Sequence, residues 1–294
     1  MATHNPRSDL LARQIDSLRA QTVTDWRCLV FDDSSSDRAA VQGLLTDPRF
    51  VLLPATEHLG AYRAFEHLLA TADDDVPTFL CDQDDVWHRS KMQRMLSGPP
   101  TAARFCAMRV VDPAGQVVRE RYLTRSPSAT ALTPAGLLMM NSVSGAALMV
   151  TPEVRRAALP FPARDLRGWH DQWLGAVAAR LGAVEYLDEP LMDYTRHDAQ
   201  VTGDGLRRID GHRLRSYART LRAQGLRRDL SGRAGWVRAA AQRLLTLPGG
   251  ADPDLEALAA GRWTGLLTAG MRRREVPPAR AALLTAGNFA HRWR

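Results

Sequence analysis

The first hundred residues switch between two spacings of apolar positions. A helical spacing of three and four residues marks the stretch from Ser8 to Leu18, where Ser8 or Asp9 can cap the helix. Short continuous apolar runs separate this helix from further helical stretches and are typical of buried strands. We expect strands at 27–31, 50–53 and 78–81, and further helices around 41–45 and 61–72.

Strands that alternate with short helices predict a mostly parallel sheet covered by helices on both faces. The first and last of the expected strands end in acidic turns, 32–37 and 82–85. Ligands bind such sheets at the carboxyl ends of the strands, so both acidic turns should lie at one rim. The pattern therefore predicts an α/β domain with a polar site at that rim.

The pattern becomes mixed after residue 100. A helix is expected over 171–181, after several short strands. From about residue 207 the chain is predicted to be helical, with arginine on the polar faces. We therefore divide the chain into an α/β domain, 1–205, and an Arg-rich helical C-terminal region, 206–294.

Composition places the chain among ordinary globular proteins, with 45% apolar and 24% charged residues. The sequence contains no run of about 18 or more apolar residues, which is the length that would predict a membrane span. Cys28, Cys81 and Cys106 are widely spaced and form no CxxC pair, which argues for a reducing compartment and against a zinc site. We expect a cytoplasmic protein.

The net charge of +7 comes almost entirely from arginine, since Lys91 is the only lysine. Genomic base composition and an anionic partner would each explain this bias. Arginines recur among Leu, Ala and Trp236 over 207–245, and a basic amphipathic helix there would suit peripheral contact with the inner face of the cell membrane. A solvated face of helices packed on the α/β domain is the simpler explanation. We expect no nucleic-acid partner, because the arginines form no binding motif with aromatic residues.

The second acidic turn, with the sequence DQDD at 82–85, offers the hard oxygen ligands that Mg²⁺ or Mn²⁺ prefers. Such ions keep positions open for substrate phosphates. A solvated acidic turn before a helix would have the same composition. The first turn, which begins with Asp32 and Asp33, is by itself a common capping pattern, but two acidic strand ends in one sheet favour a site for a nucleotide diphosphate.

Two later segments carry candidate chemistry. Asp171 lies between Trp169 and Trp173 at the start of a helix, and a carboxylate that is partly desolvated by aromatic rings suits a general base. A helix cap flanked by core tryptophans is the alternative. Arg196 and His197 follow a short strand and suit a phosphate or a metal-bound phosphate, although a loop with two exposed polar residues has the same pattern.

Together these segments resemble family 2 glycosyltransferases of the GT-A fold, of the rhamnosyltransferase kind. DQDDVW at 82–87 and HDQW at 170–173 are the more specific matches when they occur as a pair. The resemblance covers roughly residues 1–205. The other matching segments, in order, are ATHN at 2–5, QIDSL at 14–18 with QT at 21–22, DDSS at 32–35, LG at 59–60 with Phe65, Lys91, NSVSG at 141–145, and 194–203.

The resemblance implies site residues at the matching positions. Asp85 is the first choice as a direct metal ligand, and Gly145 would border the acceptor. The implied residues are Ala2, His4 and Asp33 for the base and ribose, Asp82, Asp84 and Arg196 for the diphosphate, Asp84, Asp85 and His197 for the divalent ion, and Asp171 for the catalytic base.

The resemblance also implies a reaction. An enzyme of this kind inverts the anomeric carbon as it moves a sugar, here rhamnose by preference, from a dTDP- or UDP-linked donor to a hydroxyl group. The acceptor would be a glycan or a lipid-linked glycan in polysaccharide biosynthesis, and Mg²⁺ or Mn²⁺ would be the cofactor.

The sequence departs from the family pattern in several places. His4 stands where relatives usually have tyrosine, Pro6 stands where they have glycine, and Arg196 is displaced by one position from its usual place. The chain also begins inside the expected first strand, and for this reason we expect the natural start to lie upstream of Met1.

Three other classes of protein compete with this interpretation. An inactive glycosyltransferase-like scaffold is disfavoured by the intact set of Asp84, Asp85 and Asp171. A nucleic-acid-binding protein is disfavoured by the acidic rim, which would repel phosphate in the absence of a metal. A nucleotidyltransferase also uses strand-end carboxylates with Mg²⁺, and the HDQW segment argues against it.

Overall fold

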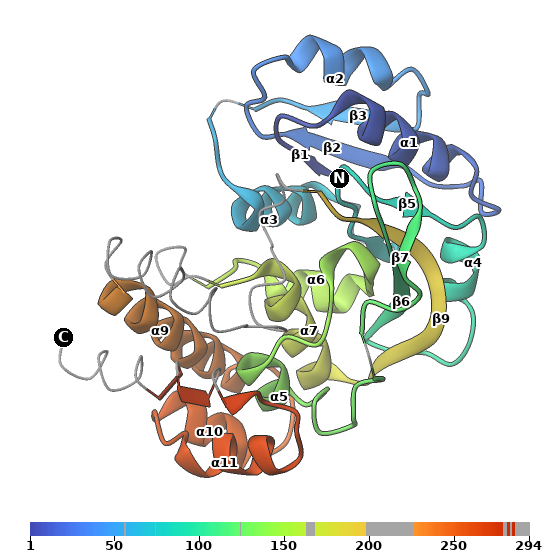
Figure 1. Ribbon diagram of the computed structural model, residues 1–294. Helices are drawn as coiled ribbons and strands as arrows, with labels where there is room; N and C mark the ends of the chain where they lie inside the picture. Colours follow the sequence, from blue (N-terminus) through green and yellow to red (C-terminus); the bar gives the residue numbers. More distant parts are fainter. Residues whose placement is uncertain are drawn as a thin grey trace.

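The elements of the protein lie in three tiers (Figure 1). A small parallel sheet with its helices forms one end, a second sheet with its helices forms the middle, and the C-terminal helices close the other end. The computed structural model describes residues 1–55, 57–73, 75–123, 125–162, 168–197, 226–278, 281–282 and 284–285.

The first tier is a three-stranded parallel sheet with the strand order β1-β2-β3. The expected runs at 27–31 and 50–53 form two of its strands, with Cys28 opposite Phe50. The expected strand at 78–81 lies in the second sheet instead, where its residues 78–79 pair antiparallel, so the two acidic turns follow strands of different sheets. Helical crossovers join parallel strands, so β1 and β2 end at the same rim. The elements of this tier are β1 (Ala2–Thr3), α1 (Ser8–Arg19), β2 (Cys28–Asp32), α2 (Arg38–Leu44), β3 (Phe50–Leu53) and α3 (Ala61–Thr71).

Although β1 is only two residues long, the start of the chain is anchored to β2. The Met1 ammonium group donates to the Leu29 carbonyl at 2.6 Å, and the Phe31 amide donates to the Met1 carbonyl at 2.9 Å. The Met1 side chain is buried in the core. The expectation that the natural start lies upstream of Met1 stays a prediction.

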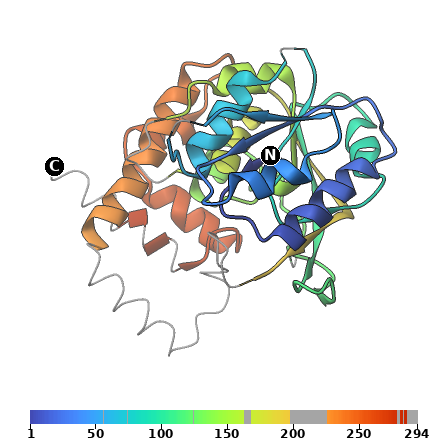
Figure 2. The same cartoon turned by 90° about the horizontal axis from the view of Figure 1, so that it is seen from above.

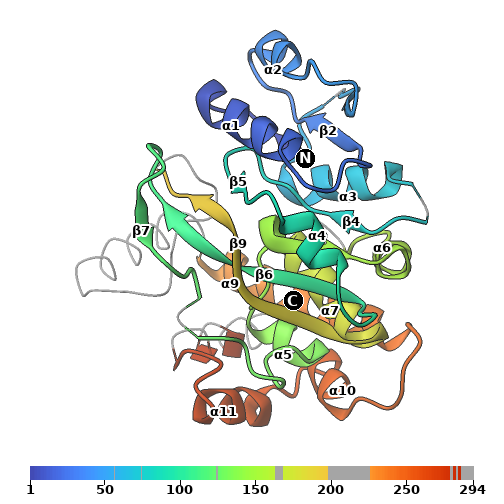
Figure 3. The same cartoon turned by 90° about the vertical axis from the view of Figure 1, so that its right-hand side faces the viewer.

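The middle tier is a mixed six-stranded sheet with the order β4-β8-β6-β9-β5, and β7 pairs with β6. The long strands β6 and β9 run parallel side by side (Figure 3), whereas the other pairs are antiparallel. Short connections such as the β6–β7 hairpin join antiparallel strands only. The strands are β4 (Thr78–Phe79), β5 (Val86–Trp87), β6 (Ala103–Val111), β7 (Val117–Arg119), β8 (Leu148–Val150) and β9 (Val184–Thr195).

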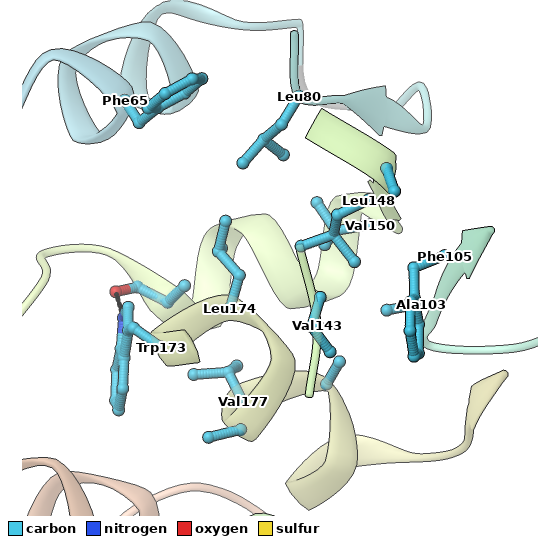
Figure 4. Packing of buried hydrophobic residues seen from close by; sticks show 14 of the residues in the cluster. Phe65, Leu80, Ala103, Phe105, Val143, Leu148, Val150, Trp173, Leu174 and Val177 are labelled. Atoms are coloured by element: carbon cyan, nitrogen blue, oxygen red, sulfur yellow. Dashed lines mark hydrogen bonds between the residues drawn. The ribbon is translucent and has the colours of Figure 1, made fainter. Parts of the chain in front are cut away.

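Helix α7 (His170–Leu181) lies at the centre of the molecule, between the second sheet and the C-terminal helices (Figures 1 and 3). Its residues Trp173, Leu174 and Val177 are fully buried (Figure 4), and the Trp173 indole N–H donates to the Ala158 carbonyl at 2.9 Å. The other helical segments of this tier are α4 (Lys91–Leu96), α5 (Pro134–Met139), the 3-10 turn η1 (Gly145–Ala147) and α6 (Pro152–Ala158).

The C-terminal helices pack against the rest of the molecule (Figure 2). They are α9 (Leu226–Leu245), α10 (Pro253–Ala259) and α11 (Thr264–Arg272). Helix α9 contacts α5, α7 and α10, and its buried Trp236 and Val237 belong to the same apolar cluster as the residues of α7. The described part of the Arg-rich region is therefore packed on the α/β domain, while the boundary at 205–206 and the arginines up to 222 lie outside the described residues.

No helix within the described ranges is long and apolar enough to cross a membrane.

Replacing Trp173 with Phe tests the centre of this core. The substitution removes the indole N–H and leaves the buried Ala158 carbonyl without its donor, so the free energy of unfolding should fall by about 1–3 kcal/mol. Urea unfolding followed by circular dichroism measures the change. Trp169→Phe is the matched control, because Trp169 is 40% exposed, and it should change stability by less than about 0.5 kcal/mol. Equal effects of the two substitutions would contradict the role of Trp173 as a core anchor.

Candidate active site

The acidic turn 82–85 lies between β4 and β5, where it meets the end of β9. Asp85 is fully buried, and its Oδ1 accepts a hydrogen bond from the Thr195 amide at 3.1 Å. Its Oδ2 is buried and has no hydrogen-bond partner among the described residues. Burial, together with the charges of Asp84 and Asp82, raises the pKa of Asp85 well above its ordinary value. Asp85 therefore ties the turn to β9 through one oxygen and leaves the other without a partner.

Asp84 and His197 meet at the same place. His197 Nε2 lies 2.7 Å from Asp84 Oδ2, and both side chains are largely buried. The contact forms because β9 ends at Thr195, beside the acidic turn, so that the residues after the strand lie over it. Arg196, between these two positions, is exposed, and its backbone amide donates to the Val111 carbonyl at 2.8 Å. The structure thus joins two predicted metal-binding residues that are 113 positions apart in the chain.

The charge of the catalytic-base candidate affects Asp82 in the acidic turn. Burial raises the pKa of Asp82 to about 7, and the nearby charges of Asp84 and Asp171 act in the same direction. Like charges that share a poorly solvated space favour the neutral forms of both groups. The printed contacts link Asp171 to this region through the η1 turn, since the Gly145 amide donates to Asp171 and the Ala146 carbonyl accepts from Lys91, whose Nζ lies over the Trp87 ring. The direct approach of Asp171 to the acidic turn stays a prediction.

Asp171 occupies the first turn of α7, where the helix dipole favours a negative charge. Its Oδ2 accepts a hydrogen bond from the Gly145 amide at 3.2 Å, and its Oδ1 accepts one from the Gln172 amide at 2.7 Å. These two donors hold the carboxylate in one orientation at the N-terminal end of the helix.

His170 packs the η1 turn tightly against the start of α7. Its ring stacks on Phe65 with centroids 4.1 Å apart, and a Cβ atom added to Gly145 would lie 2.6 Å from His170 Nε2. Only glycine therefore fits at position 145 without displacing the ring. Burial lowers the pKa of His170, which keeps the imidazole neutral, and both ring nitrogens are buried without hydrogen-bond partners among the described residues.

The carboxylates of the first acidic turn accept hydrogen bonds from neighbouring groups of the protein. Asp33 is buried and accepts hydrogen bonds from the Leu59 amide at 2.5 Å and from the Gly60 amide at 2.7 Å. These bonds fix the loop before α3, where Gly60 has a φ of 74°. Asp32 accepts from the hydroxyl of Thr3 at 2.9 Å. Asp33 thus shapes the wall of the rim, and its predicted contact with a ribose stays a prediction.

His4 links the two acidic turns. Its backbone amide donates to Gln83 Oε1 at 2.8 Å, while its ring Nδ1 lies 2.7 Å from the Asp33 carbonyl oxygen. Ala2 pairs with Phe31 in the adjoining strand. The three residues predicted for the base and ribose, Ala2, His4 and Asp33, therefore lie together at the ends of β1 and β2, next to the predicted metal turn.

Lys91 is a site residue whose role the sequence did not predict. It is fully buried, and its Nζ donates to the Ala146 carbonyl at 2.7 Å and lies 3.7 Å from the centre of the Trp87 ring. Burial lowers the pKa of this ammonium, and the carboxylates of Asp85 and Asp82 oppose that shift. The sequence feature that could have indicated this role is composition, because the only lysine of an arginine-rich chain lies six positions after Asp85.

The donor atoms suit a divalent ion only if the substrate contributes ligands. Within the ranges that the structure describes, no group of three or more His, Cys, Asp or Glu side chains is arranged to hold a metal. Asp84 and His197 nevertheless present an oxygen and a nitrogen side by side, and the unbonded Oδ2 of Asp85 is nearby in the same turn. Mg²⁺ and Mn²⁺ commonly take one or two protein ligands and complete their shell with phosphate oxygens.

Comparison with known proteins relates this site to a family. Residues 1–114, which include both acidic turns, match the family model described as glycosyl transferase family 2. An uncharacterized glycosyltransferase of Nostoc sp. is 26% identical over 201 residues, which are 64% of this chain and 61% of that protein. The chain therefore spans less than two thirds of the length of that relative.

Similar folds occur among solved glycosyltransferases. One is S. aureus TarS 1–349 in complex with UDP-GlcNAc, with a TM-score of 0.53 and 12% identity over 99% of this chain and 89% of that chain. Another is the mannosyltransferase PcManGT from Pyrobaculum calidifontis in complex with GDP-Man and Mn²⁺, with a TM-score of 0.53 and 17% identity over 99% and 85%. They confirm the predicted GT-A fold with its C-terminal helices.

The raised pKa of Asp82 predicts how stability depends on pH. In the folded protein the pKa of Asp82 is about 7, whereas an unperturbed carboxyl has a pKa of 3.8. Between pH 3.8 and about pH 7 the unfolded chain therefore binds fewer protons than the folded protein. Stability contributed by this group is then present below about pH 4 and is lost as the pH rises towards 7. Asp82→Asn, which is neutral throughout, should raise the melting temperature at pH 8 in EDTA and leave it nearly unchanged at pH 4.5.

The control for this measurement is Asn at the exposed Asp25, which should shift the melting temperature little at either pH. A difference between wild type and Asp82→Asn that is the same at pH 4.5 and pH 8 would show that Asp82 is ionised throughout.

Proposed function

We propose that this protein is an inverting, divalent-metal-dependent glycosyltransferase that moves a sugar from a nucleotide-diphosphate donor to a hydroxyl of a glycan or a lipid-linked glycan. The observation that carries the proposal is the link between Asp171 and the segment after the acidic turn: the Gly145 amide donates to Asp171, and the adjacent Ala146 carbonyl accepts from Lys91, whose Nζ lies 3.7 Å from the centre of the Trp87 ring. A base and a diphosphate-binding cluster in one pocket are what direct displacement at a sugar carbon needs.

Asp171 is the general base of the proposed reaction. It takes the proton of the acceptor hydroxyl as that oxygen bonds to the anomeric carbon, while the bond from this carbon to the diphosphate oxygen breaks on the opposite side. Attack opposite to the leaving group inverts the anomeric configuration, and the transition state has oxocarbenium character. The Gly145 amide and the first turn of α7 hold the carboxylate in one orientation.

Asp84 and His197 would hold the divalent ion, Mg²⁺ or Mn²⁺, with the Oδ2 of Asp85 as a further ligand. When bound, such an ion neutralises the charge that builds on the departing diphosphate. Asp82, next to these residues, and Arg196, beside His197, would face the diphosphate. Ala2, His4 and Asp33 would border the base and ribose at the ends of β1 and β2.

For the donor we propose a dTDP- or UDP-linked sugar, with rhamnose favoured. The DQDD sequence at 82–85 is the reason for this preference. UDP-GlcNAc and GDP-Man, the ligands bound in the two structural neighbours, belong to the same chemical class of nucleotide-diphosphate sugars. We further propose a cytoplasmic location, with peripheral contact at the inner face of the cell membrane where a lipid-linked acceptor would be presented.

Asp171→Asn tests the catalytic base. The amide keeps the shape of the side chain but accepts no proton, so kcat should fall by about 100-fold or more. Donor binding should persist, because the acidic turn is unchanged. Single-turnover sugar transfer and calorimetric titration of the nucleotide measure the two quantities. Asp254→Asn is the matched control, since Asp254 is an exposed carboxylate in the first turn of α10. Transfer near the wild-type rate in Asp171→Asn would refute the assignment.

A thermal-shift panel tests the donor class and the metal together. Ligands that bind the native state raise the melting temperature by mass action, so dTDP, UDP and GDP are compared with and without Mn²⁺. One nucleotide should give the largest shift, and that shift should depend on Mn²⁺. Asp84→Ala should abolish the Mn²⁺ dependence, because it removes the partner of His197. Shifts that are equal with and without Mn²⁺ would rule out the proposed metal site.

A further inference from the structure

Two contacts join the C-terminal helix α9 to the start of the helix that carries Asp171. The first is made by Gln172, which follows the proposed base directly and is fully buried. Its Nε2 donates to the carbonyls of Leu137 and Leu138 at 2.6 and 2.9 Å, and its Oε1 accepts a hydrogen bond from Arg233 Nη2. Every polar atom of this buried amide is therefore bonded, and α9 supplies one of the three bonds.

The second contact is made by Trp236, one helical turn after Arg233. Its ring is fully buried against the backbone that leads into α7, and a Cβ atom added to Gly168 would lie 1.9 Å from Trp236 Nε1. The same Nε1 donates to the Tyr62 hydroxyl at 3.3 Å, and that hydroxyl donates to the Pro162 carbonyl at 3.1 Å. Trp236 thus contacts Gly168 directly and is linked to Pro162 through the Tyr62 hydroxyl.

We infer that α9 is part of the catalytic unit, and that Arg233 and Trp236 are positioning residues for the base Asp171. The Arg233 guanidinium lies 5.1 Å from the centre of the Trp236 ring, so one face of α9 makes both contacts. This inference rests on the proposed function, because it assigns these residues a role through Asp171. It extends the catalytic unit into the C-terminal helices, beyond the site residues already proposed and beyond residues 1–114, which match the family model.

The positions of the contacts predict which kinetic constant depends on them. The backbone N–H of Gln172 donates to Asp171 Oδ1, so a shift of Gln172 moves the proposed base. A displacement of about 1 Å in a reacting group costs on the order of 100-fold in rate. The acidic turn is held separately, by the pairing of β5 with β9 and by the Thr195 amide. Loss of the α9 contact should therefore lower kcat and leave donor binding intact.

Arg233→Met tests this role, because methionine keeps an apolar chain of similar reach and removes the guanidinium donors. We expect kcat for sugar transfer to fall about 10- to 100-fold, while the KM for the donor and the Mn²⁺-dependent thermal shift with the nucleotide stay within about twofold. Arg233→Lys should recover part of the lost kcat, since its ammonium group can still donate to Gln172 Oε1. Arg238→Met is the matched control on the same helix and should keep the wild-type kcat.

Hydrogen exchange provides a readout that does not depend on activity. In Arg233→Met the amides of the first turn of α7 should exchange faster than in wild type, and those of the acidic turn 82–85 should be unchanged. Wild-type kcat in Arg233→Met, equal impairment of Arg233→Lys and Arg233→Met, or an equal loss of donor binding and kcat would each overturn the inference while the proposed function stands. A wild-type protein that transfers no sugar would instead overturn the proposed function, and the role assigned to Arg233 with it.

Discussion

Mutual repulsion among carboxylates that share one poorly solvated rim is the constraint on which this structure depends. Asp82, Asp84 and Asp85 lie within one turn, and Asp171 is linked to this region through the η1 turn, where the Gly145 amide binds Asp171 and the Ala146 carbonyl binds Lys91. Burial and like charge favour the neutral forms of such groups, and here they raise the pKa of Asp82 to about 7. A site of this kind persists only because the surrounding fold stabilises the charges, and binding of a cation or of a cationic side chain relieves the repulsion.

Each element around the rim contributes to that stabilisation. The end of β9 supplies the Thr195 amide to Asp85 and the His197 ring to Asp84. The only lysine of the chain is buried close by, with its ammonium group bonded to the Ala146 carbonyl and placed over the Trp87 ring. The neighbouring Gly145 amide in turn binds Asp171. The polar network and the apolar core are therefore continuous, and the position of the proposed base depends on how α7 packs.

Helix α7 connects the chemistry to the stability of the whole molecule. Its first turn carries Asp171, its middle buries Trp173 and Val177 in the core, and α9 packs along it. The HDQW segment accordingly combines two functions that the sequence presented as alternatives. Asp171 binds the Gly145 amide at the start of the helix, and Trp173 is a core anchor bonded to Ala158.

The sequence by itself determined the α/β class, the acidic turns at the strand ends and the helix that begins near Asp171, because apolar spacing and turn chemistry are local properties of the chain. Only the tertiary structure decided which polar atoms meet. Asp84 and His197, which are in contact, are 113 positions apart in the chain, and Arg233 and Gln172 are 61 positions apart. Asp33 accepts hydrogen bonds from the amides of Leu59 and Gly60, 26 and 27 positions away. Such contacts depend on strand register and on helix packing, which bring together residues that are far apart in the chain and therefore cannot be read from local apolar spacing.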